Sequence, residues 1–402
     1  MSRDEGGLRR ALLALCVTEL TSWGILYYSF PVALIEVTRD TGWSTATAMT
    51  AYSAGLVVSA LAGAPVGRLL DRRGPRPVMT AGSALGTAAL LAVAAAPGLP
   101  WFTAAWMLAG LAQSALLYPP AFAALTRWYG PDRVRPLTTL SLVGGLASTV
   151  YAPLTALLAA HLGWRTTYLV LAALLCAITL PLHLLFLTPA WPGASASPRE
   201  APGPSIREVA SSRAFLLLAA GMALGGFGLY AATSNLVPLL VDRGTGTAAA
   251  ATALGLCGAG QVLGRIGYPA LTGRSSPRAR TVAVLAAAAA GIALLAVVPG
   301  PPALLIAAAV FAGAVRGVYT LVQATAVSDR WGVRRFATLN GLATAPTALA
   351  VALAPAAGAF LAGLLGGYTA ALTVLALVAL AGAFLAAGTR PAPPSLGPEV
   401  DG

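Results

Sequence analysis

Apolar runs of about 20 residues recur along this chain from one end to the other. An α-helix of that length crosses the hydrocarbon core of a bilayer, which is about 30 Å thick. Lipid offers the backbone no hydrogen-bond partners, so a chain crosses it as helices or as a closed barrel. The runs are continuous and rich in Ala, Leu and Gly, without the alternation typical of barrel strands. With 57% hydrophobic and 9% charged residues, the chain is predicted to be an all-α membrane protein.

The apolar runs predict twelve membrane-spanning helices. Their expected ranges are 11–35, 45–66, 77–97, 101–125, 138–160, 166–188, 214–240, 247–269, 280–298, 303–326, 337–361 and 366–388.

The arginines give the expected orientation, because every second connection between predicted helices is rich in them. All 25 basic residues are arginines, and 20 lie on one side of the predicted membrane against three on the other. The three are Arg39, Arg165 and Arg243, and the 20 are Arg3, Arg9, Arg10, Arg68, Arg72, Arg73, Arg76, Arg127, Arg133, Arg135, Arg199, Arg207, Arg213, Arg274, Arg278, Arg280, Arg330, Arg334, Arg335 and Arg390. Basic residues in short loops remain cytoplasmic, so both termini are expected in the cytoplasm and the chain in the inner (plasma) membrane. This topology accounts for the net charge of +12, and no nucleic-acid partner is expected.

A segment rich in Pro, Ser and Gly, residues 189–213, divides the chain into two predicted halves of six helices each, 1–188 and 214–388, followed by a tail, 389–402. The halves match when the chain is shifted by 202 residues. At that shift Gly24, Tyr28, Asp40, Gly42, Thr45, Arg72, Pro75 and Arg76 fall on Gly226, Tyr230, Asp242, Gly244, Thr247, Arg274, Pro277 and Arg278. An internal duplication explains these matches and predicts two six-helix halves related by pseudo-twofold symmetry.

The segment between the second and third predicted helices, Gly67–Arg76, reads GRLLDRRGPR, and we call it the signature segment. It resembles the G-x-x-x-D-R-x-G-x-R motif of the major facilitator superfamily. We expect Gly67 to end a helix and Asp71 to face a helix N-terminus or a guanidinium. With Arg72, Gly74 and Arg76 it would form a clasp that favours one conformational state; the alternative is that the arginines only set orientation. In the second half Pro269 and Gly273 replace Gly67 and Asp71, so the clasp is predicted to be asymmetric.

Further motifs resemble the monocarboxylate-porter branch and its bacterial relatives. They are Trp23-Gly24, Gly42-Trp43-Ser44, the run Gly74–Met79 and Gly163-Trp164-Arg165. The resemblance implies a small organic anion as substrate and assigns Arg265 to the position where these porters bind its carboxylate. It also implies that the first, fourth, seventh and tenth helices line the cavity, which places Tyr118 and Tyr319 at the substrate site. These porters carry an acidic residue one turn before that arginine, and this chain has Gln261 there.

Three charged residues lie well inside predicted spans, where each costs roughly 2.5–3.5 kcal/mol and therefore suggests function: Glu19, Arg265 and Arg316. Arg265 and Arg316 suit an organic anion, since a guanidinium grips a carboxylate with two parallel hydrogen bonds. Arg265 alternatively extends to the cytoplasmic edge. Glu19 is a candidate proton carrier or, alternatively, a structural partner of Arg316 or of a hydroxyl. Tyr28 and Tyr230, which match in the repeat, are further candidates for the substrate site.

These observations predict a proton-coupled secondary transporter of a small organic anion, with a drug or metabolite exporter as the alternative. No nucleophile, metal cluster or acid-base pair stands at catalytic spacing, which argues against an enzyme, and neither cofactor nor metal is expected. A passive channel has no need of a clasp. The expected partners are the substrate, protons and the lipid bilayer, with the chain as a monomer.

Overall fold

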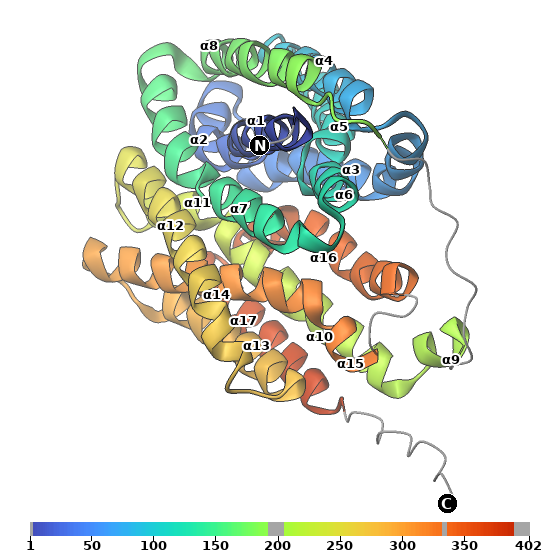
Figure 1. Ribbon diagram of the computed structural model, residues 1–402. Helices are drawn as coiled ribbons and strands as arrows, with labels where there is room; N and C mark the ends of the chain where they lie inside the picture. The colour runs from blue at the N-terminus through green and yellow to red at the C-terminus, as the bar shows by residue number, and fades with distance from the viewer. Residues whose placement is uncertain (1–2, 192–204, 332–335, 390–402) are drawn as a thin grey trace, which may run out of the picture.

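Helices account for the regular structure of residues 3–191, 205–331 and 336–389, which the computed structural model describes (Figure 1). No strand occurs among these residues, which confirms the all-α prediction. The helices before residue 192, here called the first group, are α1 (Arg3–Trp23), the π-helix η1 (Gly24–Tyr28), α2 (Ser29–Thr41), α3 (Thr45–Arg73), α4 (Pro75–Ala94), α5 (Leu99–Leu116), α6 (Tyr118–Tyr129), the 3-10 helix η2 (Gly130–Arg133), α7 (Val134–Gly145) and α8 (Ala147–Phe186). Those after residue 204, the second group, are α9 (Ile206–Ala210), α10 (Arg213–Ser234), α11 (Leu236–Asp242), α12 (Thr247–Thr272), α13 (Pro277–Val297), α14 (Pro302–Thr325), α15 (Ser328–Trp331), α16 (Phe336–Leu364) and α17 (Tyr368–Ala387).

Within the described ranges, eleven helical stretches are long and apolar enough to cross a membrane. All but one correspond to a single predicted helix. The exception is the 53-residue stretch Val134–Phe186, which covers two predicted helices, 138–160 and 166–188. At about 1.5 Å per residue it far exceeds a hydrocarbon core of about 30 Å. It is also interrupted, because Gly163 has φ 71° and ψ 165°, outside the helical region.

The end of α3 corrects one sequence-based expectation. Gly67 does not end this helix, which continues to Arg73. The residue that ends it is Gly74, whose φ of 80° favours glycine and whose N–H donates to the Leu70 carbonyl at 2.8 Å. Hydropathy marks the part of a helix that lies in lipid, whereas the helix itself extends further into its charged end.

The same helix pairings recur in both groups. In the first group α3 packs on α5, and α4 packs on α5 and α8; in the second α12 packs on α14, and α13 packs on α14 and α17. Between the groups, α3 packs on α16 and α8 on α12. Figure 1 shows the first group in blue to green above the second group in yellow to red.

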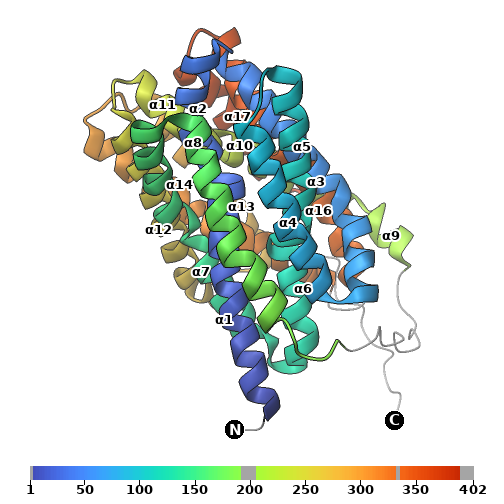
Figure 2. The same ribbon diagram turned by 90° about the horizontal axis from the view of Figure 1, so that it is seen from above.

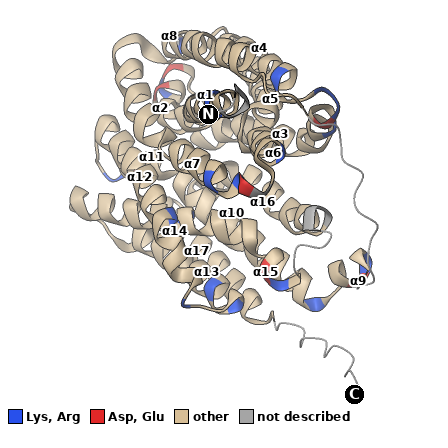
Figure 3. Ribbon diagram, viewed as in Figure 1, with Lys and Arg blue, Asp and Glu red and all other residues tan. Residues whose placement is uncertain are grey.

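Figure 2 shows α1 running from the N-terminus toward the end of the molecule where α2 lies. At that end, apolar residues of both groups form one buried cluster that includes Val32, Ala152, Leu236 and Leu254. Charged residues gather mainly at helix ends and connections, while the helix shafts are largely uncharged (Figure 3). Four arginines used in the topology prediction, Arg199, Arg334, Arg335 and Arg390, lie outside the described residues.

Candidate functional site

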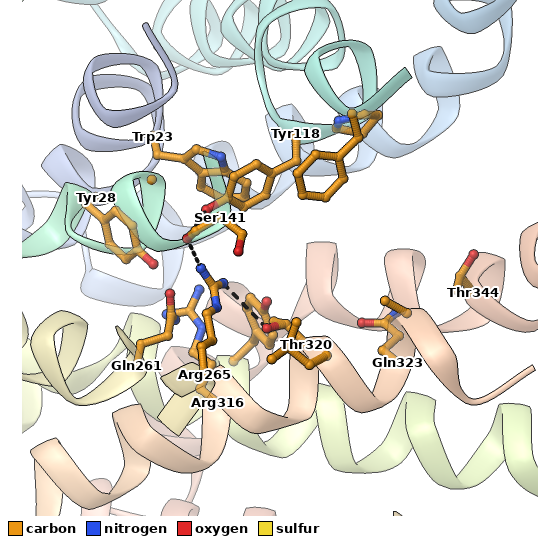
Figure 4. A pocket seen from close by; sticks show the side chains of 16 residues that line it. Trp23, Tyr28, Tyr118, Ser141, Gln261, Arg265, Arg316, Thr320, Gln323 and Thr344 are labelled. Carbon is orange, nitrogen blue, oxygen red and sulfur yellow. Dashed lines mark hydrogen bonds between the residues drawn. The ribbon is translucent and has the colours of Figure 1, made fainter. Parts of the chain in front are cut away.

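A cavity of about 410 Å³ lies between the two helix groups. Its lining from the first group is Trp23, Tyr28, Tyr118, Pro119, Phe122, Ser141 and Gly144; from the second group it is Tyr230, Gln261, Arg265, Arg316, Thr320, Leu321, Gln323, Ala324 and Thr344. Figure 4 shows Trp23 and Tyr118 on one side of the cavity and Arg265, Gln261 and Thr320 on the other. The cavity therefore has an aromatic wall and a polar, cationic wall.

The two arginines are brought side by side by a close crossing of α12 and α14. A Cβ at Gly264 would lie 2.1 Å from the Ala314 carbonyl oxygen, and one at Gly317 would lie 2.0 Å from the Gln261 carbonyl oxygen. Glycine is required at both positions, because a side chain would separate the two backbones. Arg265 directly follows Gly264, and Arg316 directly precedes Gly317, so this contact positions both guanidinium groups.

Arg316 is a buried cation without a counterion among the described residues. It is 4% exposed, and no hydrogen bond or ion pair of its side chain occurs within the described ranges. Its guanidinium carbon lies 4.2 Å from the ring centre of Tyr230, 5.6 Å from that of Tyr28 and 5.9 Å from that of Tyr27. Aromatic faces attract a cation but do not neutralise it. The positive charge of Arg316 is therefore available to a ligand in the cavity.

Arg265 is 7% exposed and points into the cavity, away from the helix end (Figure 4). Its Nη1 donates to the Ser141 carbonyl on α7, and its Nη2 donates to Thr320 Oγ1 at 3.4 Å. Arg265 thus connects the second helix group to the first across the cavity. In this conformation it faces the cavity, which is one of the two positions expected from the sequence.

Tyr28 lies at the end of the π-helix η1, which interrupts the path from α1 to α2. Single π-turns within α-helices are frequent at functional sites. A Cβ at Gly24, the first residue of η1, would lie 2.1 Å from Tyr151 Cδ2, so glycine allows this turn to pack against α8. Tyr28 and its repeat match Tyr230 both line the cavity and both lie against Arg316.

Glu19 is fully buried on α1 but is not among the residues that line the cavity. Neither of its carboxylate oxygens has a hydrogen-bond partner among the described residues. The alternative interpretation of Glu19 as a structural partner of Arg316 or of a hydroxyl has no contact to support it there. Trp23 lies one helical turn further along and does line the cavity, so Glu19 lies next to the site.

The two tyrosines suggested by the resemblance have different positions. Tyr118 lines the cavity, with its ring centre 5.0 Å from that of Trp23. Tyr319 does not line it: this side chain is fully buried and donates to the Met222 carbonyl on α10 at 2.7 Å. Tyr319 therefore supports the packing of α14 on α10.

Several lining residues were not assigned to the site from sequence. Trp23, Phe122, Gln261, Thr320 and Gln323 belong to this set. Helical spacing is the signal that finds them: Gln261 lies four residues before Arg265, Phe122 four after Tyr118, and Thr320 and Gln323 four and seven after Arg316.

The signature segment lies outside this cavity. Arg127 Nη2 on α6 donates to Asp71 Oδ1 at 2.6 Å, and Arg76 Nε donates to the Leu184 carbonyl on α8 at 2.8 Å. Asp71 therefore faces a guanidinium, and the contacts of the segment are with the first helix group and Trp191. Arg72 is exposed. In the second group Asp329 stands at the repeat position of Arg127 and pairs with Arg280, which stands at the repeat position of Val78 and not of Asp71.

An Asp71→Asn variant should remain folded and transport more slowly. The ion pair is exposed, so its loss should change the free energy of unfolding by less than about 1 kcal/mol. A shift of that size between conformational states corresponds to an initial uptake rate about fivefold lower. Thermal melting and initial-rate uptake measure the two effects, with Asp132→Asn as a control at an exposed acid without a described ion pair. Unchanged uptake would instead indicate that the arginines of the signature segment only set the orientation of the chain in the membrane.

Comparison with known proteins places these features in a family. Residues 13–303 match the model of the Major Facilitator Superfamily. Human monocarboxylate transporter 11 is 29% identical over 393 residues, which cover 94% of this chain and 81% of that protein. Bos taurus monocarboxylate transporter 13 is 28% identical over 388 residues, covering 94% and 85%. The inward-facing, occupied crystal structure of a bacterial homolog of the human lysosomal transporter Spinster has a TM-score of 0.72 at 18% identity, covering 96% of this chain and 98% of that one.

Proposed function

The chain belongs to the Major Facilitator Superfamily and is therefore a multi-pass membrane transporter and not an enzyme, and on this premise we propose that it carries a small organic anion of the monocarboxylate type. We propose further that transport is secondary active, coupled to protons and performed by alternating access.

The observation that carries the proposal is the uncompensated charge of Arg316. A buried charge is costly unless it is paired, and no described acidic residue pairs with it. A substrate carboxylate would supply the missing partner through two parallel N–H···O bonds. Arg265 adds a second positive charge in the same cavity, whereas no acidic residue lines it. A cationic substrate would be repelled.

The position of the cavity supports alternating access. Gln323 and Ala324 lie near the last residue of α14, at the arginine-rich end of the molecule, while the buried apolar cluster closes the opposite end. The cavity lies between the two helix groups, where a relative movement of the groups would change its access. Arg265 connects the groups through Ser141. A substrate carboxylate that binds Arg265 would compete with the Ser141 carbonyl for the Arg265 N–H groups. Substrate binding would thus be coupled to the relative movement of the two helix groups.

The names of the relatives support the substrate class. Human monocarboxylate transporter 11 and Bos taurus monocarboxylate transporter 13 both align with 94% of this chain. Arg265 and the cavity give this chain a physical means to bind a carboxylate, and Glu19 is the group we propose for the coupled proton.

Direct binding and transport measurements test the proposed function. In a thermal-shift screen of the purified protein, small carboxylates should raise the melting temperature, and amines of the same size should not, because a ligand stabilises the state that it binds. Counterflow of a radiolabelled carboxylate in proteoliposomes should then show exchange. Stabilisation and exchange by amines in preference to acids would refute an anion transporter.

We also propose twelve crossings in two six-helix halves, residues 1–188 and 214–388, with both termini cytoplasmic in the plasma membrane and the chain active as a monomer.

The crossings can be tested in a variant that lacks Cys16, Cys176 and Cys257. An impermeant maleimide added to intact cells should label Thr41→Cys and His161→Cys, and label Thr272→Cys only after permeabilisation. His161 is exposed beside the interruption at Gly163. If His161→Cys is labelled only together with Thr272→Cys, the stretch Val134–Phe186 does not cross twice and the twelve-helix topology is wrong.

A further inference from the structure

Three polar side chains of the cavity lining lie close together and donate no side-chain hydrogen bond to any described residue. They are Arg316, Tyr28 and Tyr230, and the two ring centres lie 5.6 and 4.2 Å from the Arg316 guanidinium carbon. Arg265 differs, because two of its nitrogens already donate to Ser141 and Thr320. The geometry therefore makes the Arg316 end the position at which a carboxylate gains the most hydrogen bonds.

The facing wall is built from three aromatic rings. The ring centres of Trp23 and Tyr118 are 5.0 Å apart, and those of Tyr118 and Phe122 are 5.0 Å apart with an interplanar angle of 12°. All three side chains line the cavity and are half-buried, so they present ring surface to it; Figure 4 shows Trp23 and Tyr118 on this wall. Such a wall binds a flat apolar group by burial and by stacking.

The size of the cavity exceeds the needs of a very small acid. At about 410 Å³ it lies within the range of roughly 300–1,000 Å³ that pockets for drug-sized ligands occupy. A two- or three-carbon acid bound at Arg316 would leave the aromatic wall without a contact. An acid whose apolar body spans the cavity would cover both walls.

We propose that the substrate is an aromatic carboxylate, with the carboxylate on Arg316, Tyr28 and Tyr230 and the aromatic ring against Trp23, Tyr118 and Phe122. This inference rests on the proposed transport of organic anions and assigns the class within it. The polar wall selects the charge, and the aromatic wall selects the ring.

Three matched probes test the proposal by isothermal titration calorimetry on the purified full-length protein. They are 3-phenylpropionate, propionate, which lacks the ring, and 3-phenylpropionamide, which lacks the charge. The Kd of 3-phenylpropionate should be at least about tenfold lower than that of propionate, because only the former buries a ring on the wall. The amide should bind at least about tenfold more weakly than the acid, because it lacks the charge-assisted bonds.

Phe122→Leu isolates the role of the wall. It should weaken 3-phenylpropionate about 2- to 10-fold and leave propionate unchanged, since leucine keeps the apolar volume but cannot stack. Phe384→Leu is the matched control, because Phe384 is 70% exposed on α17, away from the cavity. If Phe122→Leu does not fold, the comparison of the three probes on the unmodified protein still decides the proposal.

The outcomes separate this inference from the proposed function. Equal affinity for propionate and 3-phenylpropionate would overturn the aromatic class and leave anion transport intact. Binding of the amide as tight as that of its acid would overturn both, as would the absence of binding by either acid.

Discussion

Arg316→Met should strongly weaken substrate binding and transport without lowering the stability of the ligand-free protein. Methionine has a similar apolar stem but removes a buried charge that has no ion-pair partner among the described residues, so the variant should melt at or above the wild-type temperature. Loss of a charge-assisted anchor should weaken carboxylate binding at least about thirtyfold, the equivalent of about 2 kcal/mol. Melting curves and counterflow measure the two effects in the same preparation.

Weaker substrate binding together with an unchanged or higher melting temperature would identify Arg316 as a substrate-binding residue. An arginine that only stabilises the fold would give the opposite pattern, with a lower melting temperature and a substrate affinity that is retained in the folded fraction. Arg274→Met serves as the control, because Arg274 is exposed in the connection between α12 and α13. Transport by Arg316→Met at the wild-type rate would remove Arg316 from the substrate site.

Glu19→Gln should uncouple transport from the proton gradient. The side chain is fully buried and neither carboxylate oxygen has a described partner, so the charged form is far more costly than the neutral form. A glutamine keeps the shape but neither binds nor releases a proton. The variant should therefore retain substrate exchange and lose accumulation driven by a pH gradient.

Proteoliposomes separate these two activities. Counterflow at equal pH reports exchange, and a pH jump across the membrane reports proton-driven accumulation. Glu36→Gln is a suitable control, since Glu36 lies on α2 in an ion pair with Arg39 at 2.7 Å. Intact pH-driven accumulation in Glu19→Gln would show that another group carries the proton.

The sequence by itself determined that this chain lies in a lipid bilayer, and it determined the fold class and the family. Runs of lipid-spanning length depend only on neighbouring residues, and the signature segment GRLLDRRGPR is contiguous, so both are legible without a structure. The comparison with the Major Facilitator Superfamily confirmed the resemblance. Arg265 and Arg316 were also evident as site candidates, because a cation within an apolar run is unusual wherever its side chain points.

The tertiary structure decided which faces of the helices meet, and local spacing does not contain that information. Tyr319 and Thr320 flank Arg316 by about 60° and 40° in opposite directions around α14, yet only Thr320 lines the cavity, while Tyr319 packs on α10. Which helix faces meet also decides where the charged side chains lie relative to the cavity. Glu19 and Arg316 were possible partners in sequence, but the packing of α1 and α14 leaves the carboxylate outside the cavity and the guanidinium without a described counterion. That separation results from contacts between distant segments, and it creates the site to which we assign the substrate.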